Sequence, residues 1–474
     1  MVLSDFEPKG VFGFFEEICG IPHGSHNTWK IADYCENFAR ERGLEYTRDE
    51  LNNIIIKKPS ENGGDTPVII QGHLDMVCES EPGYEIDFEK DGLTLEVKDG
   101  YIGAKGTTLG ADDGIAVAMA LALLDDDTIV HPGIEAVFTV DEEVGMTGAA
   151  AIDLSELKSG TVMNIDSEEE GVLTAGCAGG VTVRCLFPVS RREKSGGIYT
   201  IRISGLTGGH SGVEIGKGRA NAAKLAAYSA AALMNEGAKL ISVNSGTKDN
   251  AIPSFGELTV AADFDVSEKC GEILAEFKGK YPAENIEITV SASSGTAKIM
   301  ENGAAVTKFI NSAPNGVQKM SGDVEGLVQT SLNLGILQTS EESVCVSFSI
   351  RSSSAAEKAT LAEEVTALAE KYGAEVSSEG DYPPWEYNEK SRLREIISET
   401  YFELYGKKPK IEIIHAGLEC GLLSQKLKNP DCVSFGPNIL DIHTPSERLE
   451  IESVRRTWEL VLKTLEKFAQ KGNI

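Results

Sequence analysis

The chain has 474 residues, of which 74 are acidic and 44 are basic, giving a formal net charge of -30 at pH 7. This length exceeds what one hydrophobic core usually supports, so we expect two domains. The negative charge disfavours nucleic acid and anionic membranes as partners, because both require a basic surface on the protein.

The nine cysteines show no repeating pattern, which favours free thiols in a reducing compartment. The first twenty residues lack the basic start and apolar block of a signal peptide. The longest apolar run, IAVAMALALL, covers only residues 115–124, which is too short to cross a membrane. We therefore expect a soluble cytoplasmic protein.

The first part of the chain alternates between predicted strands and helices. Residues 27–43 have apolar positions at helical spacing and end at Gly43. Residues 113–127 are predicted to form a buried helix, and strands are expected at 52–59, 67–72, 133–140 and 160–166. This alternation indicates an α/β domain with a largely parallel sheet flanked by helices.

The pattern changes from about residue 188. Alternating strands at 198–205 and 257–265 are now mixed with helices at 219–237 and 266–281. The paired prolines in GDYPPWEYN, residues 380–388, suit a crossing between domains. We predict one domain made of residues 1–187 and 382–474, and an inserted α+β domain at 188–381.

The insert contains a weak internal repeat. Residues 252–277 and 332–365 both have the order strand, strand, helix. The repeat predicts that the insert consists of two tandem similar halves, with chance convergence as the alternative.

Five short stretches concentrate histidine and carboxylate residues beside glycines or at predicted strand ends. They are GHLDMV (72–77), GADDG (110–114), DEEVG (141–145), NID (164–166) and DIHTPSE (441–447). In an open α/β sheet, side chains that leave the carboxyl ends of the strands converge on one crevice. We therefore expect the five stretches to meet in space.

Imidazoles combined with carboxylates suit Zn²⁺, with Mn²⁺ or Co²⁺ as alternatives, whereas a structural zinc site would show paired cysteines. Asp75 can lie behind His73, because residues two apart share a face, and can orient its ring. Glu142 and Glu143 diverge, so that one can bind a metal while the other faces the reacting water.

Each stretch alone has a simpler interpretation. GHLDMV could form an ordinary hydrogen bond, and GADDG could be a helix start capped by Asp112 or Asp113. DEEVG could be a solvated acidic loop. The five stretches together, in this order and at sheet ends, favour a catalytic metal centre.

These stretches, together with NIDSEEEG, GCAGG, TGGHSGVEIGKGRANA and HAGLECG, resemble the M20 family of two-zinc peptidases over essentially the whole chain. The resemblance is greatest to the Xaa-His dipeptidase (aminoacyl-histidine dipeptidase) branch of that family. It implies a zinc-peptidase-like catalytic domain and an inserted lid domain.

The resemblance also implies the roles of the site residues. One zinc would be bound by His73, Asp112 and Asp166, and the other by Asp112, Glu143 and His443. Asp112 would bridge the two metals, and the peptide bond after it is typically cis in the family. Glu142 would be the general base, and Asp75 would orient His73.

In the lid, the resemblance makes His210 an oxyanion-side donor, Asn250 a substrate contact and Arg351 the clamp for the substrate carboxylate. In HAGLECG, Gly417 would offer backbone contacts, and Glu419 would either meet the substrate amino group or have a structural role. Dimeric relatives take the lid histidine from a partner subunit. Our hypothesis is that this chain supplies histidine and arginine itself, so both a monomer and a homodimer remain open.

The predicted function is a metal-dependent dipeptidase that hydrolyses short peptides, Xaa-His dipeptides among them. Another M20 activity, that of a tripeptidase, carboxypeptidase or N-acyl amino acid deacylase, is the alternative. A metal-bearing binding protein without catalysis is disfavoured by Glu142, which only hydrolysis would require to be a carboxylate.

Overall fold

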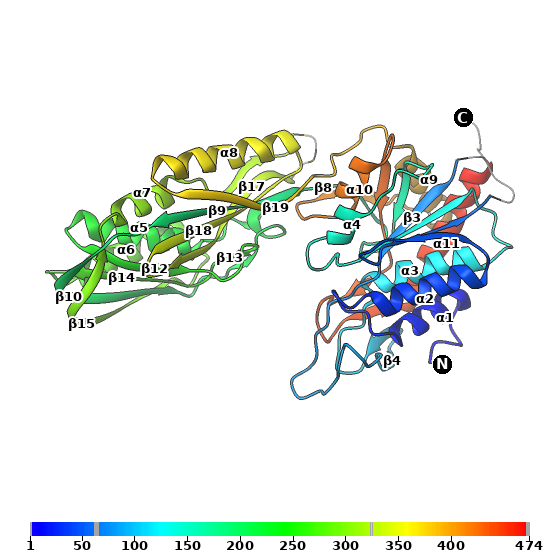
Figure 1. Cartoon of the computed structure of the whole chain (residues 1–474), viewed down its shortest axis with the longest axis horizontal. Coiled ribbons are helices and arrows are strands. Elements are labelled where there is room, and N and C mark those ends of the chain that lie inside the picture. Colours follow the sequence, from blue (N-terminus) through cyan, green and yellow to red (C-terminus); the bar gives the residue numbers. More distant parts are fainter. Residues whose placement is uncertain (1, 61–65, 323, 325, 471–474) are drawn as a thin grey trace. The chain divides into compact units, whose positions relative to one another are not determined.

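The computed structural model describes residues 2–60, 66–322, 324 and 326–470. It contains two compact units, and Figure 1 labels their helices and some of their strands. Unit 1 comprises Met1–Gly176, Tyr387–Ile413 and Leu418–Ile474, and unit 2 comprises Cys177–Glu386 and Ile414–Gly417. Each unit has its own hydrophobic core.

Unit 1 is built on an eight-stranded sheet with the order β1-β2-β6-β3-β7-β21-β8-β20. In this order the strands are Glu45–Arg48, Ile54–Lys58, Ile134–Thr139, Val68–His73, Thr161–Asn164, Asp431–Ser434, Val172–Cys177 and Lys410–Ile414. The central strands β6, β3, β7 and β21 are parallel. Every residue of β3 and β6 is buried, as expected for parallel strands that are covered on both faces.

The parallel arrangement predicted from the sequence is therefore present, but it is confined to the centre of the sheet. β1 and β2 pair antiparallel with each other, and β2 pairs antiparallel with β6. The connection from β1 to β2 covers only residues 49–53, and so short a connection permits an antiparallel pair but no parallel crossover.

The helices of unit 1 are α1 (Lys9–Cys19), α2 (Trp29–Glu41), α3 (Ala111–Asp125), α4 (Thr147–Ala151), α9 (Arg392–Tyr405), α10 (Cys420–Lys426) and α11 (Ile451–Gln470). α3 packs against α1 and β3. Its residues 111–124 are all buried, because the run 115–124 is apolar on every side of the helix and can only lie in the core. The start of α3 is thereby held beside the carboxyl end of β3.

A small four-stranded sheet of unit 1 has the order β22-β23-β5-β4. Its strands are Ile439–Leu440, Arg448–Glu450, Tyr101–Ala104 and Leu95–Lys98. β22 and β23 pair antiparallel, so residues 441–447 form the loop of a hairpin. This hairpin loop carries His443.

Unit 2 contains a nine-stranded sheet with the order β15-β10-β14-β12-β17-β18-β9-β19, and β16 pairs with β17. In this order the strands are Glu287–Met300, Arg191–Ser204, Gly256–Ala262, Lys239–Ser245, Val328–Thr339, Ser343–Ser352, Gly179–Pro188 and Glu375–Tyr382, and β16 is Gly316–Met320. The helices are α5 (Ala222–Asn235), α6 (Ser267–Lys280), α7 (Gly303–Ser312) and α8 (Ala355–Lys371), with a short 3₁₀ turn at Ile215–Lys217. The two-residue strands β11 (Gly209–His210) and β13 (Ala251–Ile252) pair separately.

The sheet of unit 2 consists of two similar halves. One half follows β10-α5-β12-β14-α6-β15, with the strands arranged β15-β10-β14-β12. The other follows β9-α7-β17-β18-α8-β19, with the strands arranged β19-β9-β18-β17. Both are the ferredoxin-like βαββαβ arrangement. The halves join where β12 pairs with β17.

The halves are nested rather than tandem, because the first is inserted between β9 and α7 of the second. β9 pairs with β18 and β19, which follow it by more than a hundred residues in the chain. Local sequence patterns carry no information about such distant pairing, so the nesting could not be predicted.

No disulfide joins any of the nine cysteines, all of which lie in the described part of the chain. In the described part of the chain, none of the helices has both the length and the apolar character needed to cross a membrane.

Candidate metal centre and active site

The predicted metal ligands come together at the carboxyl edge of the parallel strands in unit 1. His73 is the last residue of β3, and Asp166 follows the end of β7 by two residues. Glu143 follows β6, and Asp112 lies at the start of α3. His443 comes from the hairpin loop between β22 and β23. The topology of the sheet therefore gathers residues that are far apart in the sequence.

The carboxylate of Asp112 faces two histidines with its two oxygens. Its Oδ1 lies 3.2 Å from Nε2 of His73, and its Oδ2 lies 3.3 Å from Nε2 of His443. One carboxylate directed at two separate imidazoles has the geometry of a bridging ligand. The peptide bond from Asp112 to Asp113 is cis, as the family resemblance implied.

The other predicted ligands complete two groups around Asp112. Oε1 of Glu143 lies 2.9 Å from Nε2 of His443, and candidate ligand atoms of Asp112, Glu143 and His443 all lie within 4.8 Å of one another. On the opposite side, Oδ1 of Asp166 lies 3.8 Å from Nε2 of His73. Oδ2 of Asp166 is buried and has no hydrogen-bond partner among the described residues.

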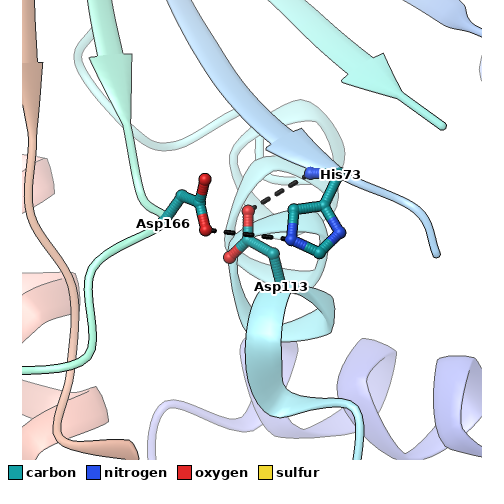
Figure 2. A group of neighbouring side chains, drawn as sticks. All are labelled: His73, Asp113 and Asp166. Atoms are coloured by element: carbon teal, nitrogen blue, oxygen red, sulfur yellow. Dashed lines mark hydrogen bonds and ion pairs between the residues drawn. The ribbon is translucent and has the colours of Figure 1, made fainter. Parts of the chain in front are cut away.

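Figure 2 shows that Asp113 also lies at this centre, together with His73 and Asp166. Oδ2 of Asp113 accepts a hydrogen bond of 3.2 Å from the main-chain N–H of His73. A side chain at Gly72 would place its Cβ only 2.5 Å from the same oxygen, so the approach requires glycine there. Sequence analysis missed this contact, although the paired aspartates and Gly72 were both visible.

Asp75 contacts two loops of the centre. Its Oδ1 accepts the main-chain N–H of Glu142 at 3.0 Å, and its Oδ2 accepts that of Glu143 at 3.4 Å. The hydroxyl of Ser25, a residue that sequence analysis did not single out, donates to Oδ2 at 2.8 Å. The carboxylate of Asp75 thus fixes the backbone of Glu142 and Glu143.

The contact between Asp75 and His73 differs in detail from the prediction. Nδ1 of His73 lies 2.9 Å from the main-chain carbonyl oxygen of Asp75 and 3.5 Å from the nearer carboxylate oxygen. The ring N–H therefore donates mainly to the carbonyl, because the side chain turns toward the amides of the glutamates. The outcome for the ring is the same, since Nε2 stays directed at Asp112 and Asp166.

The protein without a metal has strongly shifted pKa values at this centre. Burial raises the pKa of Glu142 to about 8, helped by the nearby carboxylates of Glu419 and Glu143. Hydrogen bonds that His443 donates to the carboxylates of Asp112 and Glu143 raise its pKa to about 10. Burial alone would lower the pKa of His73, but the carboxylates of Asp112 and Asp75 outweigh it and raise that pKa well above its usual value.

Glu419 lies at the same edge of the sheet but is fully buried. Its Oε2 accepts hydrogen bonds of 2.6 Å from Nε2 of Gln71 and of 2.6 Å from the hydroxyl of Thr139. Burial raises its pKa to about 7. The predicted contact of Glu419 with the substrate amino group stays a prediction. The two hydrogen bonds connect Glu419 with β3 and β6, which is a structural role.

The remaining predicted residues, His210, Asn250, Arg351 and Gly417, all belong to unit 2. Burial lowers the pKa of His210, and the positive charge of Arg351 lowers it further, so the two side chains are close enough to interact. The guanidinium of Arg351 donates to the hydroxyl of Tyr382 at 2.9 Å, while its Nε has no partner among the described residues. The main-chain oxygen of Asn250 accepts from the N–H of Ser211 at 2.8 Å.

Two neighbours of Arg351 were given no role of their own by the sequence analysis, although one of them, His415, is the first residue of HAGLECG. Ser331 is its cross-strand partner on β17, and the hydroxyl of Ser331 lies 2.7 Å from Nε2 of His415. Burial, followed by the charge of Arg351, lowers the pKa of His415 to about 4. No local signal marks Ser331, because its place depends on strand register.

Comparison with known proteins supports the same interpretation. The sequence model of peptidase family M20/M25/M40 matches residues 69–467. The chain belongs to this family. The resemblance noted in the sequence is thereby confirmed, and with it the expectation of a hydrolase that acts on peptide bonds.

The relatives include proteins that match over their whole length. The cytosol non-specific dipeptidase of Escherichia coli (strain K12) is 36% identical over 99% of both chains. The solved structure of aminoacylhistidine dipeptidase from Vibrio alginolyticus is 36% identical, covers 98% of each chain and has a TM-score of 0.88. A tripeptidase from Staphylococcus aureus, 18% identical with a TM-score of 0.61 and coverage of 98% and 99%, shares the fold. These matches confirm the predicted α/β peptidase fold.

Proposed function

We propose that the chain is a metal-dependent dipeptidase that hydrolyses short peptides with a free carboxylate, Xaa-His dipeptides among them. The observation that carries this proposal is the carboxylate of Asp112, whose two oxygens face His73 and His443. The full-length similarity to two dipeptidases supports the choice of dipeptides over longer peptides.

The residues at the centre fit a pair of divalent cations. Asp112, Glu143 and Asp166 form ion pairs only with histidines in the described part of the chain, so no lysine or arginine there offsets their charge. Buried carboxylates without such compensation are costly unless a cation binds them. The unpartnered Oδ2 of Asp166 is a further acceptor for a cation.

Two sets of residues would hold these cations. His73, Asp112 and Asp166 would bind one, and Asp112, Glu143 and His443 would bind the other. The mixture of imidazole and carboxylate suits Zn²⁺, with Mn²⁺ or Co²⁺ as alternatives. When bound, such a pair lowers the pKa of a shared water and polarises the scissile carbonyl group.

Glu142 would act as the general base. It would accept the proton of the attacking water and then return it to the leaving amine. In the protein without a metal, burial raises the pKa of Glu142 to about 8. The positive charge of bound cations would lower this pKa and so favour the ionised form that a general base requires. Asp75 would keep Glu142 in place through the hydrogen bond to its main-chain N–H.

Unit 2 would supply the substrate-binding residues. Arg351 would pair with the terminal carboxylate of the peptide, for which a guanidinium offers two parallel hydrogen bonds. His210 would donate to the oxygen of the scissile carbonyl, and Asn250 and Gly417 would contact the substrate. The electrostatic interaction of His210 with Arg351 within one unit supports a single chain as the source of both.

A panel of substrates tests the function. Dipeptides, including carnosine, are compared with tripeptides and N-acyl amino acids, using protein as purified, stripped with a chelator, and resupplied with Zn²⁺, Mn²⁺ or Co²⁺. We expect dipeptide hydrolysis that the chelator abolishes and a metal restores. Hydrolysis confined to tripeptides or acylated amino acids would favour the alternative M20 activities, and metal binding without any hydrolysis would favour a binding protein.

Dilution tests whether one chain is sufficient. We expect the specific activity to stay constant as the protein is diluted below any concentration at which dimers form. Activity that disappears together with the dimer would contradict a single-chain source of His210 and Arg351. Nine cysteines without a disulfide among them support a cytoplasmic location, since thiols persist in a reducing compartment.

A further inference from the structure

The carboxylate of Glu447 lies at the last position of the hairpin loop 441–447 and is buried, with 4% of the residue exposed. It accepts hydrogen bonds from four consecutive main-chain N–H groups. Oε2 accepts from Leu109 at 2.7 Å and from Gly110 at 3.1 Å. Oε1 accepts from Ala111 at 2.9 Å and from Asp112 at 3.5 Å.

These four amides have no local acceptor. They precede or open α3, whose N-cap residue Gly110 cannot offer a side-chain hydrogen bond. The first N–H groups of a helix lack partners inside the helix, and they carry partial positive charge. The carboxylate of Glu447, which comes from a distant segment, accepts hydrogen bonds from these N–H groups and offsets their partial positive charge. The position of the α3 start therefore depends on Glu447.

The α3 start determines where Asp112 directs its carboxylate. Asp112 has non-helical backbone angles (φ -84°, ψ 102°). Its two carboxylate oxygens lie 3.2 and 3.3 Å from the two histidines, so a small shift of this backbone would alter both contacts. The hydrogen bonds that Glu447 accepts from the N–H groups of residues 109–112 fix this backbone. They therefore also fix the direction in which the Asp112 carboxylate points.

The other end of the connection is the loop that carries His443. Inside this loop, the main-chain N–H of Glu447 donates to the carbonyl oxygen of Thr444 at 3.0 Å. The hydroxyl of Thr444 donates to the carbonyl oxygen of Asp441 at 2.7 Å. These two hydrogen bonds stabilise the conformation of the loop on both sides of His443. Contacts that fix the position of Glu447 therefore also fix the position of the histidine.

We infer that Glu447 is a positioning residue that couples the loop of His443 to the loop of Asp112 and so assembles the second cation site. This inference rests on the metal centre described under the proposed function. Both Asp112 and His443 belong to the second ligand set, whereas only Asp112 belongs to the first. Loss of Glu447 should therefore weaken the second site more than the first.

The test measures Zn²⁺ binding rather than hydrolysis. Chelator-stripped wild type, Glu447→Gln and Glu447→Asp are titrated with Zn²⁺ in competition with a chromogenic chelator. Glu447→Gln replaces one acceptor oxygen with an amide group that faces N–H donors. We expect its second equivalent of Zn²⁺ to bind roughly 10- to 100-fold more weakly, the first to change less, and Glu447→Asp to be intermediate.

Glu135→Gln is the matched control. Glu135 is also buried, with 3% exposed, and it accepts main-chain N–H groups from Lys158 at 2.9 Å and Ser159 at 3.1 Å. It lies near the start of β6, away from the residues that follow the end of that strand. We expect Glu135→Gln to lower the melting temperature while both Zn²⁺ affinities stay at their wild-type values.

Wild-type affinities in folded Glu447→Gln would overturn the inference, and so would an equal loss of affinity in Glu135→Gln. If Glu447→Gln does not fold, Glu447→Asp decides, and wild-type affinity for its second Zn²⁺ overturns the inference. A wild-type protein that binds no Zn²⁺ would instead refute the metal centre itself. Faster hydrogen exchange of a peptide covering residues 109–112 in Glu447→Gln would support the predicted loosening.

Discussion

Replacement of Glu142 by glutamine gives the sharpest test of the proposed chemistry. Glutamine has nearly the same shape, but its amide cannot accept a proton from water. The hydrogen bond from the main-chain N–H of residue 142 to Asp75 does not involve the side chain and should persist. The substitution therefore removes the base and leaves its surroundings in place.

The magnitude follows from the role of the residue. General base catalysis contributes roughly 10²- to 10⁴-fold to rates, which corresponds to about 2.7 to 5.4 kcal/mol in activation free energy. Glu142 belongs to neither proposed ligand set, so two equivalents of metal should remain bound. We expect kcat to fall by that factor, with a small change in KM.

The matched variant is Glu143→Gln, one residue away. Oε1 of Glu143 lies 2.9 Å from Nε2 of His443, and its loss should lower the metal content. The assay measures dipeptide hydrolysis and metal content on the same samples. The reasoning is refuted if Glu142→Gln loses a metal, because Glu142 would then be a ligand, or if it retains wild-type turnover.

Three further predictions concern the same centre. His443→Ala should lose one of two bound Zn²⁺ ions, and full two-metal content by elemental analysis would contradict its ligand role. In the metal-free protein the raised pKa values of His73 and His443 stabilise the fold below pH 6.5, and the His443 contribution disappears as pH rises through about 10. Since Zn²⁺ binds neutral imidazole, binding near pH 7 should release protons and tighten as pH rises. Titration calorimetry in buffers of different ionisation enthalpy measures this release, and its absence would contradict the prediction. Gly72→Ala would place a Cβ 2.5 Å from Oδ2 of Asp113 and 2.8 Å from Cβ of Ala116, so we expect about 1 to 3 kcal/mol of destabilisation, and an unchanged melting temperature would show that the contact is relaxed without cost.

Much of the fold was predictable because it depends on local patterns. Short apolar runs followed by glycine and ligand-type residues marked the strands and the edge at which their side chains meet. The apolar run 115–124 of α3 could only belong to a core helix. The unit 2 halves were visible as a repeat, but their nesting was not, since it arises from pairing of β9 with strands that come much later in the chain.

The sequence by itself determined which chemical groups are present and at which strand ends they stand. The stretches that contain the ligands could be found because residue types and neighbours are local properties of the chain. The family resemblance then singled out His73, Asp112, Glu143, Asp166 and His443 within them. Mixed imidazole and carboxylate donors without paired cysteines already indicated a catalytic metal.

Only the tertiary structure decided which atom faces which. Asp112 and Glu447 are separated by 335 positions, and their contact exists because a hairpin loop of the small sheet lies against the start of α3. Asp113 and Asp75 likewise act through main-chain amides of other segments. Main-chain amides are the same at every residue, so a sequence cannot mark those that a carboxylate will bind, and folding alone selects them.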